Sequence, residues 1–294
     1  MGAEDRFPYK VSISKDGNYF TFFSGYTEKY AEEKKLGWHQ DDRVHFYTKE
    51  GNKQLWTYRT SGSPEISPDG SYVIVDYSAG EGGGYDILTY EGKKVFEYPS
   101  KKWWGDASYV FSPDSNYFAV VDEPRRPLTL FQRDGTKLWE RGIHKRPASI
   151  SEGAAYISTY PYRDAIHPEN SHNGIVYNKA GNVVMEGFGF LSGNGSKIAI
   201  LSSGKVSIMS LPDKVTTKEI PVQASFAVFS YDGRYLVLRN ESTLIGFDLL
   251  EDIRKEITIT ELGKFPLILL TTDGKYLLIL PEWESSKIYY YQLY

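Results

Sequence analysis

The sequence predicts an all-β protein: a seven-bladed β-propeller with four antiparallel strands in each blade. Three observations support this prediction. A hairpin phrase recurs seven times along the 294 residues, and a second hairpin follows most of the copies. One unit therefore holds four short strands in about 42 residues, which is typical of a propeller blade. Aromatic residues make up 15% of the chain, as suits strands that are half buried.

The first hairpin of each unit carries the clearest repeat. Its two strands flank a short polar turn, in which Asp and Gly supply side-chain hydrogen bonds and positive φ angles. Apolar residues alternate after the turn, as a half-buried strand requires. The seven copies cover residues 12–23, 65–76, 110–121, 149–160, 190–201, 228–239 and 269–280.

The second hairpin completes the unit and defines the blade boundaries. Copies cover residues 44–58, 85–98, 128–141 and 174–187, with weaker versions at 205–220 and 243–257. A single blade cannot bury both of its faces, so the seven units must pack radially as one domain over residues 1–294. The blades are expected at approximately 9–60, 61–100, 107–143, 147–187, 188–221, 224–259 and 263–294.

The seventh unit contains only a third strand after its first hairpin, within residues 287–294. The segment 3–7 precedes the first copy and is long enough for a short strand. We expect this N-terminal strand to pair with the last blade and close the ring, because closure removes exposed strand edges.

The phrase Ser-Pro-Asp-Gly-Ser-Tyr at residues 67–72 resembles the WD-repeat-like propellers of prokaryotic proteins, including the periplasmic Tol-system propeller. The segment LFQRDGTKLWE at 130–140 also resembles the blade ending of quinoprotein-type propellers. The resemblance covers nearly the whole chain and implies the fold. It does not imply one function, because such propellers perform binding, scaffolding and catalysis.

Composition excludes several classes of function. The formal net charge is −4, whereas nucleic-acid binding needs a basic surface, so no nucleic-acid partner is expected. The chain has no cysteine, which excludes disulfides and thiolate metal sites. No run of apolar residues is long enough to span a membrane. Two compartments stay open, the cytoplasm and an extracytoplasmic location after removal of a leader; the second is preferred.

Loop lengths predict which face of the propeller binds a partner. The four strands of a blade are lettered A to D in chain order. The turns that join strands A to B and C to D are short, whereas the B–C loops at 24–43, 77–84, 122–127 and 160–173 are longer. The D–A loops at 99–106 and 142–148 lie on the same face as the B–C loops. Long loops are often functional, and Tyr, Trp and Arg are enriched at interfaces. The predicted binding residues are Trp38, Trp103, Trp104, Arg125, Arg126, Arg146, Tyr160, Tyr162 and Arg163.

Sites for metal or catalysis have weaker support. His167, Glu169 and His172 could ligate zinc, but their spacing matches no established pattern and a polar loop is preferred. Asp41 and Asp42 are interpreted as solvated charges rather than calcium ligands. The stretch GEGGGYD at 80–86 is interpreted as a flexible loop, because it lacks the residues of a phosphate-binding loop. A short helix is expected within residues 27–37.

Catalytic serine and cofactor sites are not expected. The chain lacks a nucleophile elbow, and His39, His45 and His144 appear singly, with His45 interpreted as structural. Trp56 and Trp139 occupy the same repeat position, so they are expected to pack between neighbouring blades rather than stack on a cofactor. No metal or cofactor is therefore predicted.

The preferred function is a non-catalytic scaffold that grips a protein or polymer partner through the long loops of blades one to four. The alternative is a small-molecule- or sugar-acting enzyme with a site at the mouth of the central channel. A third hypothesis is a detached domain of a larger polypeptide. The sequence does not determine the oligomeric state.

Overall fold

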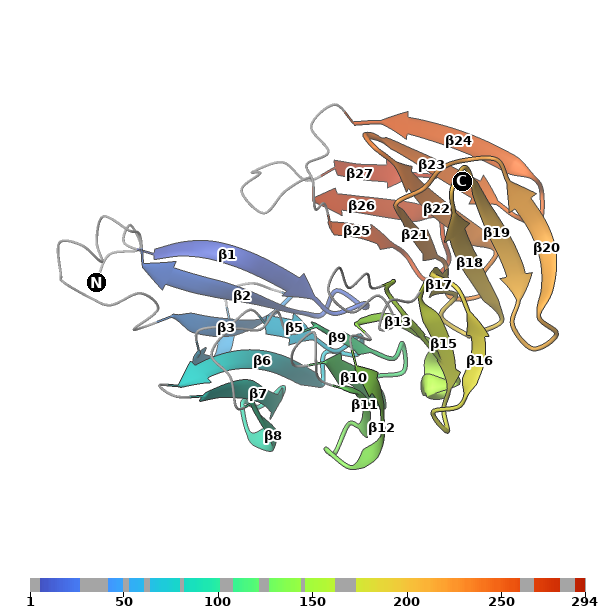
Figure 1. Cartoon of the computed structure of the whole chain (residues 1–294). Coiled ribbons are helices and arrows are strands. Elements are labelled where there is room, and N and C mark those ends of the chain that lie inside the picture. The colour runs from blue at the N-terminus through green and yellow to red at the C-terminus, as the bar shows by residue number, and fades with distance from the viewer. Residues whose placement is uncertain are drawn as a thin grey trace. The chain divides into compact units, whose positions relative to one another are not determined.

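The computed structural model describes residues 6–26, 42–49, 53–60, 64–79, 82–100, 108–121, 127–143, 146–161, 173–259, 267–280 and 289–293. These residues form seven antiparallel sheets, and the chain is a seven-bladed β-propeller (Figure 1). Six sheets have four strands in the described residues, and the last sheet has three. The fold class predicted from the repeats is therefore confirmed.

The chain divides into two compact units. Unit 1 contains residues 1–107 and 133–136, and it holds blades one and two. Blade one consists of β1 (Arg6–Ile13), β2 (Tyr19–Tyr26), β3 (Arg43–Thr48) and β4 (Gln54–Arg59). Blade two consists of β5 (Pro64–Ile66), β6 (Tyr72–Ala79), β7 (Gly82–Thr89) and β8 (Lys94–Ser100).

Unit 2 contains residues 108–132 and 137–294, and it holds blades three to seven. Blade three consists of β9 (Ser108–Phe111), β10 (Tyr117–Val121), β11 (Pro127–Gln132) and β12 (Lys137–Ile143), and blade four of β13 (Pro147–Ile150), β14 (Tyr156–Thr159), β15 (Ile175–Asn178) and β16 (Val183–Glu186). Blade five consists of β17 (Gly189–Leu191), β18 (Lys197–Ser202), β19 (Lys205–Ser210) and β20 (Val215–Ile220). Blade six consists of β21 (Phe226–Phe229), β22 (Tyr235–Asn240), β23 (Thr243–Asp248) and β24 (Ile253–Thr258). Blade seven consists of β25 (Leu267–Leu270), β26 (Tyr276–Leu280) and β27 (Tyr289–Gln292).

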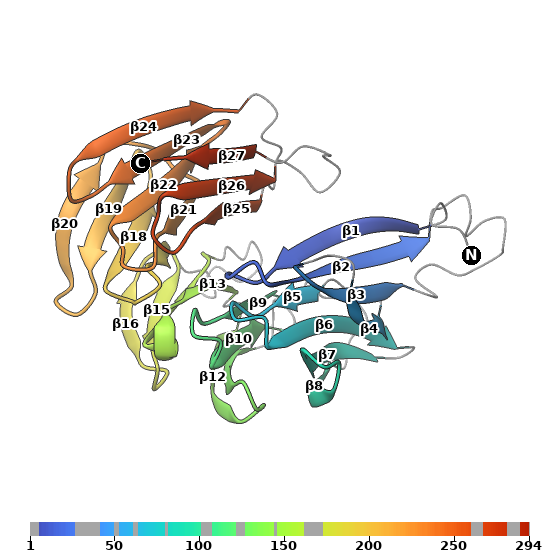
Figure 2. The same cartoon turned by 180° about the vertical axis from the view of Figure 1, so that it is seen from behind.

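The first strands of successive blades lie next to one another within unit 2. β13 contacts β9 and β17, and β21 contacts β17 and β25 (Figures 1 and 2). The first strand is therefore the inner strand of each blade. One 3₁₀ turn, Glu152–Ala154, lies among the described residues and replaces the Asp-Gly turn of blade four.

The start of the described chain corrects the expected closure by residues 3–7. Arg6 pairs with Tyr26, and Phe7 pairs with Gly25, so both residues belong to the first hairpin of blade one. The physical reason is that the β1–β2 hairpin is long and continues past a bulge at Pro8–Lys10. Residues 3–5 lie outside the described residues.

The glycine-rich stretch of blade two is a strand, so the expected loop over residues 77–84 is wrong for most of its length. Gly82, Gly83 and Gly84 pair with Ala79, Ser78 and Tyr77. Only residues 80 and 81 separate β6 from β7. The pairing also continues onto β8, where Gly83 lies opposite Ser100, so this hairpin lengthens the sheet.

The repeated turns share one hydrogen-bond pattern. In blade one, the Ser14 hydroxyl donates to Asp16 at 2.6 Å and accepts from the amide of Tyr19 at 3.0 Å. In blade seven, the Thr271 hydroxyl and the Lys275 amide donate to Asp273 and hold the pKa of that carboxyl below its usual value. In these two blades the Ser or Thr hydroxyl and the Asp carboxylate therefore close the turn through bonds between residues at most five positions apart.

The glycine of the turn also has a packing role between neighbouring blades. Gly70 has a φ of +73° and Gly274 a φ of +72°, a region that glycine adopts readily. A Cβ atom at Gly70 would overlap the ring of Tyr19, and one at Gly274 would overlap the ring of Tyr235. The Tyr of one blade thus lies directly on the turn of the next blade.

The tryptophans of the second hairpin pack between blades, as predicted. The indole N–H of Trp56 donates to the carbonyl of Tyr90 in blade two at 2.9 Å. The indole N–H of Trp139 donates to the carbonyl of Lys179 in blade four at 2.8 Å. Both rings therefore have a structural partner in the neighbouring blade.

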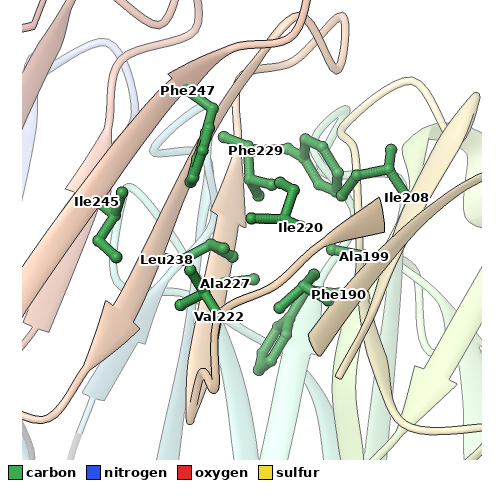
Figure 3. Packing of buried hydrophobic residues seen from close by; sticks show 12 residues of the cluster. Phe190, Ala199, Ile208, Ile220, Val222, Ala227, Phe229, Leu238, Ile245 and Phe247 are labelled. Carbon is green, nitrogen blue, oxygen red and sulfur yellow. The ribbon is translucent and has the colours of Figure 1, made fainter. Parts of the chain in front are cut away.

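The largest apolar cluster of unit 2 lies between blades five and six (Figure 3). Phe190, Ile208 and Ile220 come from blade five and meet Leu238 and Phe247 of blade six. All five side chains are buried. Burial of this apolar surface is the main favourable contribution to the contact between the two blades.

A polar cluster joins blades one and two, and it predicts a pH dependence of stability. The Tyr58 hydroxyl donates to the buried carboxylate of Asp86, whose other oxygen lies 3.4 Å from the Lys94 ammonium. Burial and the hydrogen bond to Asp86 raise the pKa of Tyr58 to about 12.

Folding therefore favours the neutral form of Tyr58. Its contribution to stability is complete below the unfolded pKa of about 10 and is lost as the pH rises toward 12. Thermal unfolding at pH 9, 10 and 11 should show a steeper loss of melting temperature in the wild-type protein than in Tyr58→Phe. Parallel losses in the two proteins would refute the prediction.

Candidate functional site

The described part of the predicted binding face lies at the ends of the B strands and the starts of the A strands. Tyr160 directly follows β14, and Arg146 directly precedes β13. The amide of Tyr160 donates to the carbonyl of Arg146 at 2.9 Å. Two of the predicted binding residues are therefore adjacent in blade four.

Blades five and six place other residues at the equivalent positions. The amide of Leu201 donates to the carbonyl of Phe188, and the amide of Ser225 donates to the carbonyl of Arg239, both at 2.9 Å. In all three blades a backbone hydrogen bond joins the first two strands at this edge, although in blade six the amide comes from the residue before the first strand. Phe188 and Arg239 thus lie on the same face as Arg146 and Tyr160.

Four aromatic side chains form a row across this face, which we call the aromatic row: Tyr160, Phe188, Phe190 and Phe226. The ring centroids of Tyr160 and Phe188 lie 5.2 Å apart, and those of Phe188 and Phe190 also lie 5.2 Å apart. Phe190 and Phe226 follow at 4.9 Å. These tilted and edge-to-face contacts are favourable for aromatic rings, so the row links blades four, five and six.

Exposure varies along the aromatic row. Phe190 is buried and anchors the row in the core between blades five and six. Phe188 and Phe226 are half buried, whereas 38% of the surface of Tyr160 is exposed. Burial of the hydroxyl raises the pKa of Tyr160, so it stays protonated and can donate a hydrogen bond at neutral pH.

An arginine lies beside the far end of the row. Arg239 is opposite Phe226 in the β21–β22 register, and its Nε donates to the carbonyl of Glu241 at 3.0 Å. Partial burial lowers the pKa of Arg239, which remains charged at neutral pH. The described surface therefore combines aromatic area with a guanidinium group, a combination that is enriched where proteins bind partners.

Most of the predicted binding residues lie outside the described residues: Trp38, Trp103, Trp104, Arg125, Arg126, Tyr162 and Arg163. The structure adds Phe188, Phe190, Phe226 and Arg239 to the candidate surface. The signal for Phe188 and Phe190 was the alternation Phe-Gly-Phe at 188–190, where the short connection after β16 enters β17. Loop length alone does not detect such residues.

The candidates for metal binding and catalysis have mixed outcomes. Asp42 is buried, so its interpretation as a solvated charge is wrong. The physical reason is that its carbonyl accepts a hydrogen bond from the amide of Thr60, the residue after β4, which holds it against the sheet. His45 is held between the Ser24 and Thr57 hydroxyls at 2.8 and 3.3 Å, as a structural residue would be.

The remaining candidates for metal binding and the expected short helix lie outside the described residues. They are Asp41, His167, Glu169 and His172, and the helix within residues 27–37. Among the described residues, no group of three or more His, Cys, Asp or Glu side chains is arranged to hold a metal ion. No described helix is long and apolar enough to cross a membrane.

Comparison with known proteins supports the fold. Hydrazine synthase of Kuenenia stuttgartiensis matches with a TM-score of 0.59 and 14% identity, covering 99% of this chain and 97% of that chain. Hsv2 of Kluyveromyces lactis matches with a TM-score of 0.59 and 11% identity, covering 94% of this chain and 91% of that chain.

A third solved structure, the dihydro-heme d1 dehydrogenase NirN, matches with a TM-score of 0.57 and 18% identity. The match covers 92% of this chain and 60% of that chain. No family model and no curated protein matches the sequence. At these identities the comparisons establish only the fold, and they do not assign a function to this chain.

Proposed function

We propose that the chain is a single propeller domain that binds a protein or polymer partner through the face carrying the B–C and D–A connections. The proposal is for binding rather than catalysis. The observation that supports it best is the aromatic row, whose outer member Tyr160 adjoins Arg146. Large amphipathic rings supply contact area at low cost in conformational entropy.

The row also extends the predicted surface beyond the first four blades. Phe188 and Phe226 add half-buried rings from blades five and six, and Arg239 adds a positive charge. A partner that covers Tyr160 can therefore contact several blades at once. Of the residues predicted from loop length, Arg146 and Tyr160 lie beside the aromatic row, and the others stay a prediction because they lie outside the described residues.

A partner-capture experiment tests the proposal. Immobilised wild-type protein and the double variant Tyr160→Ala/Phe188→Ala are compared for retention of native partners. We expect the double variant to retain at least roughly tenfold less, because aromatic residues at the centre of an interface commonly contribute 2 kcal/mol or more. The variant Trp103→Ala/Trp104→Ala should weaken retention as well.

Tyr90→Ala is the matched control. Tyr90 is also an exposed tyrosine, but it lies in the C–D turn of blade two. The control should retain partners at the wild-type level, and all variants should keep the wild-type circular dichroism spectrum. Normal retention by the folded Tyr160→Ala/Phe188→Ala protein would refute the proposed surface.

A further inference from the structure

The A–B turn of blade five differs from the equivalent turns of other blades in one residue. Five blades place an aspartate two residues after the Ser or Thr that opens the turn: Asp16, Asp69, Asp114, Asp232 and Asp273. Blade five has Asn194 in this place, and Gly195 follows it. An asparagine side chain is attacked most readily by the next backbone nitrogen when that nitrogen belongs to glycine, which has no side chain to shield it. The turn of blade five therefore carries a reactive pair that these five turns lack.

Two hydrogen-bond donors hold the side-chain oxygen of Asn194. The Ser192 hydroxyl donates to Oδ1 at 3.0 Å, and the backbone amide of Ser196 donates to the same atom at 2.9 Å. Negative charge develops on Oδ1 when a nucleophile adds to the side-chain carbon Cγ. Two preorganised donors at such an oxygen act as an oxyanion hole, which stabilises the charge as it forms. The turn is thus arranged to activate the Asn194 side chain.

The nucleophile is the backbone nitrogen of Gly195, which lies between Asn194 and Ser196 and so inside the loop closed by the second of these hydrogen bonds. Its N–H donates to the carbonyl of Ser192 at 3.0 Å, and this bond must open before the nitrogen reacts. Such opening of a short surface turn needs no global unfolding. Asn194 is exposed, so water and hydroxide reach it.

We propose that Asn194 is a site of spontaneous deamidation, which converts it to an aspartate that the turn accepts. The Gly195 nitrogen loses its proton to hydroxide and adds to Cγ of Asn194, while Ser192 and Ser196 stabilise the oxyanion on Oδ1. The bond from Cγ to the side-chain nitrogen then breaks, and that nitrogen takes a proton from water and leaves as ammonia. Water opens the resulting cyclic imide, so the net reaction consumes one water and releases one ammonia.

The neighbouring blade shows why the turn accepts the product. In blade six the Ser230 hydroxyl and the Arg234 amide donate to one oxygen of Asp232 at 2.7 and 3.0 Å. Blade five presents the same two donors to Oδ1 of Asn194, so an aspartate keeps both hydrogen bonds and strengthens them with its charge. Opening of the imide at the other carbonyl gives isoaspartate, which lengthens the backbone and does not fit this turn.

Mass spectrometry of the aged full chain tests the proposal. The protein is incubated at pH 8 and digested with trypsin, which places Asn194 in the peptide 180–197. This peptide should gain one mass unit with time, and fragmentation should assign the gain to Asn194. The second Asn-Gly pair of the sequence, Asn173–Gly174, falls in the peptide 164–179 and serves as the internal reference for the rate. The variant Asn194→Asp should melt no lower than the wild type.

Two variants of Ser192 test the role of the turn. Ser192→Ala removes one donor and should slow the conversion of Asn194 roughly fivefold relative to that of Asn173. Ser192→Thr keeps a hydroxyl, as Thr271 does in blade seven, and should convert at the wild-type rate. An unconverted Asn194 in the aged wild type, or conversion in Ser192→Ala that is unchanged or faster, would overturn the proposal, because the turn would then shield the residue. A lower melting temperature of Asn194→Asp would contradict the fit of the product.

Discussion

Replacing Gly274 with alanine is expected to lower the free energy of unfolding by about 3 kcal/mol, the combined effect of a strained backbone and an overpacked contact. Gly274 has a φ of +72°, which costs an L-residue about 1 kcal/mol. The new Cβ atom would overlap the ring of Tyr235, which is buried. Relief requires moving a ring that packs between blades six and seven.

Gly204→Ala separates the two contributions. Gly204 has a φ of +79°, yet a Cβ atom there would meet no other atom within 4 Å. This variant should therefore lose only about 1 kcal/mol. Urea unfolding of the wild type and both variants measures the difference. Equal losses would show that the contact between Tyr235 and the turn contributes nothing.

The second large effect is expected at Asp248, whose carboxylate is buried at the end of β23. It accepts hydrogen bonds from Arg234 at 2.7 Å and from the amides of Leu250 and Glu251 at 3.0 and 3.2 Å. Asp248→Ala leaves these donors without their acceptor and should lower the free energy of unfolding by about 2 kcal/mol. The loss is smaller than for a fully buried ion pair, because Arg234 is partly solvated.

The Arg234 guanidinium lowers the pKa of Asp248, which gives this effect a pH dependence. A carboxyl with a depressed pKa stabilises the fold above its unfolded pKa of about 4, and this contribution is lost as the pH falls further. The difference in unfolding free energy between the wild type and Asp248→Asn should therefore be large at pH 7 and smaller at pH 2.5. A difference that is independent of pH would exclude the ion pair as its source.

The turns and hairpins could be predicted from the sequence because their causes are local. Ser14 and Asp16 close a turn through bonds that span only a few residues, and the same bonds recur in other blades. The extension of blade two could not be predicted in this way. Gly83 has no side chain that signals a strand, and its pairing with Ser78 and Ser100 depends on long-range register.

The candidate surface was predictable only in part, for a related reason. Arg146 and Tyr160 lie in connections whose length draws attention to them. Phe188 directly precedes β17 and Phe226 begins β21, both next to inner strands, where an aromatic residue is usually part of the core. Their partial exposure depends on how neighbouring blades meet, which is a tertiary property that a single sequence does not show.

Amide hydrogen exchange of the partner complex tests the central claim, that the partner binds the face formed by the B–C and D–A connections. Residues 159–161, 187–190 and 224–226 contain the aromatic row and its neighbours on that face. These segments should exchange more slowly in the complex than in the free protein. Protection confined to the opposite turns, such as 231–234 and 271–275, would contradict the claim.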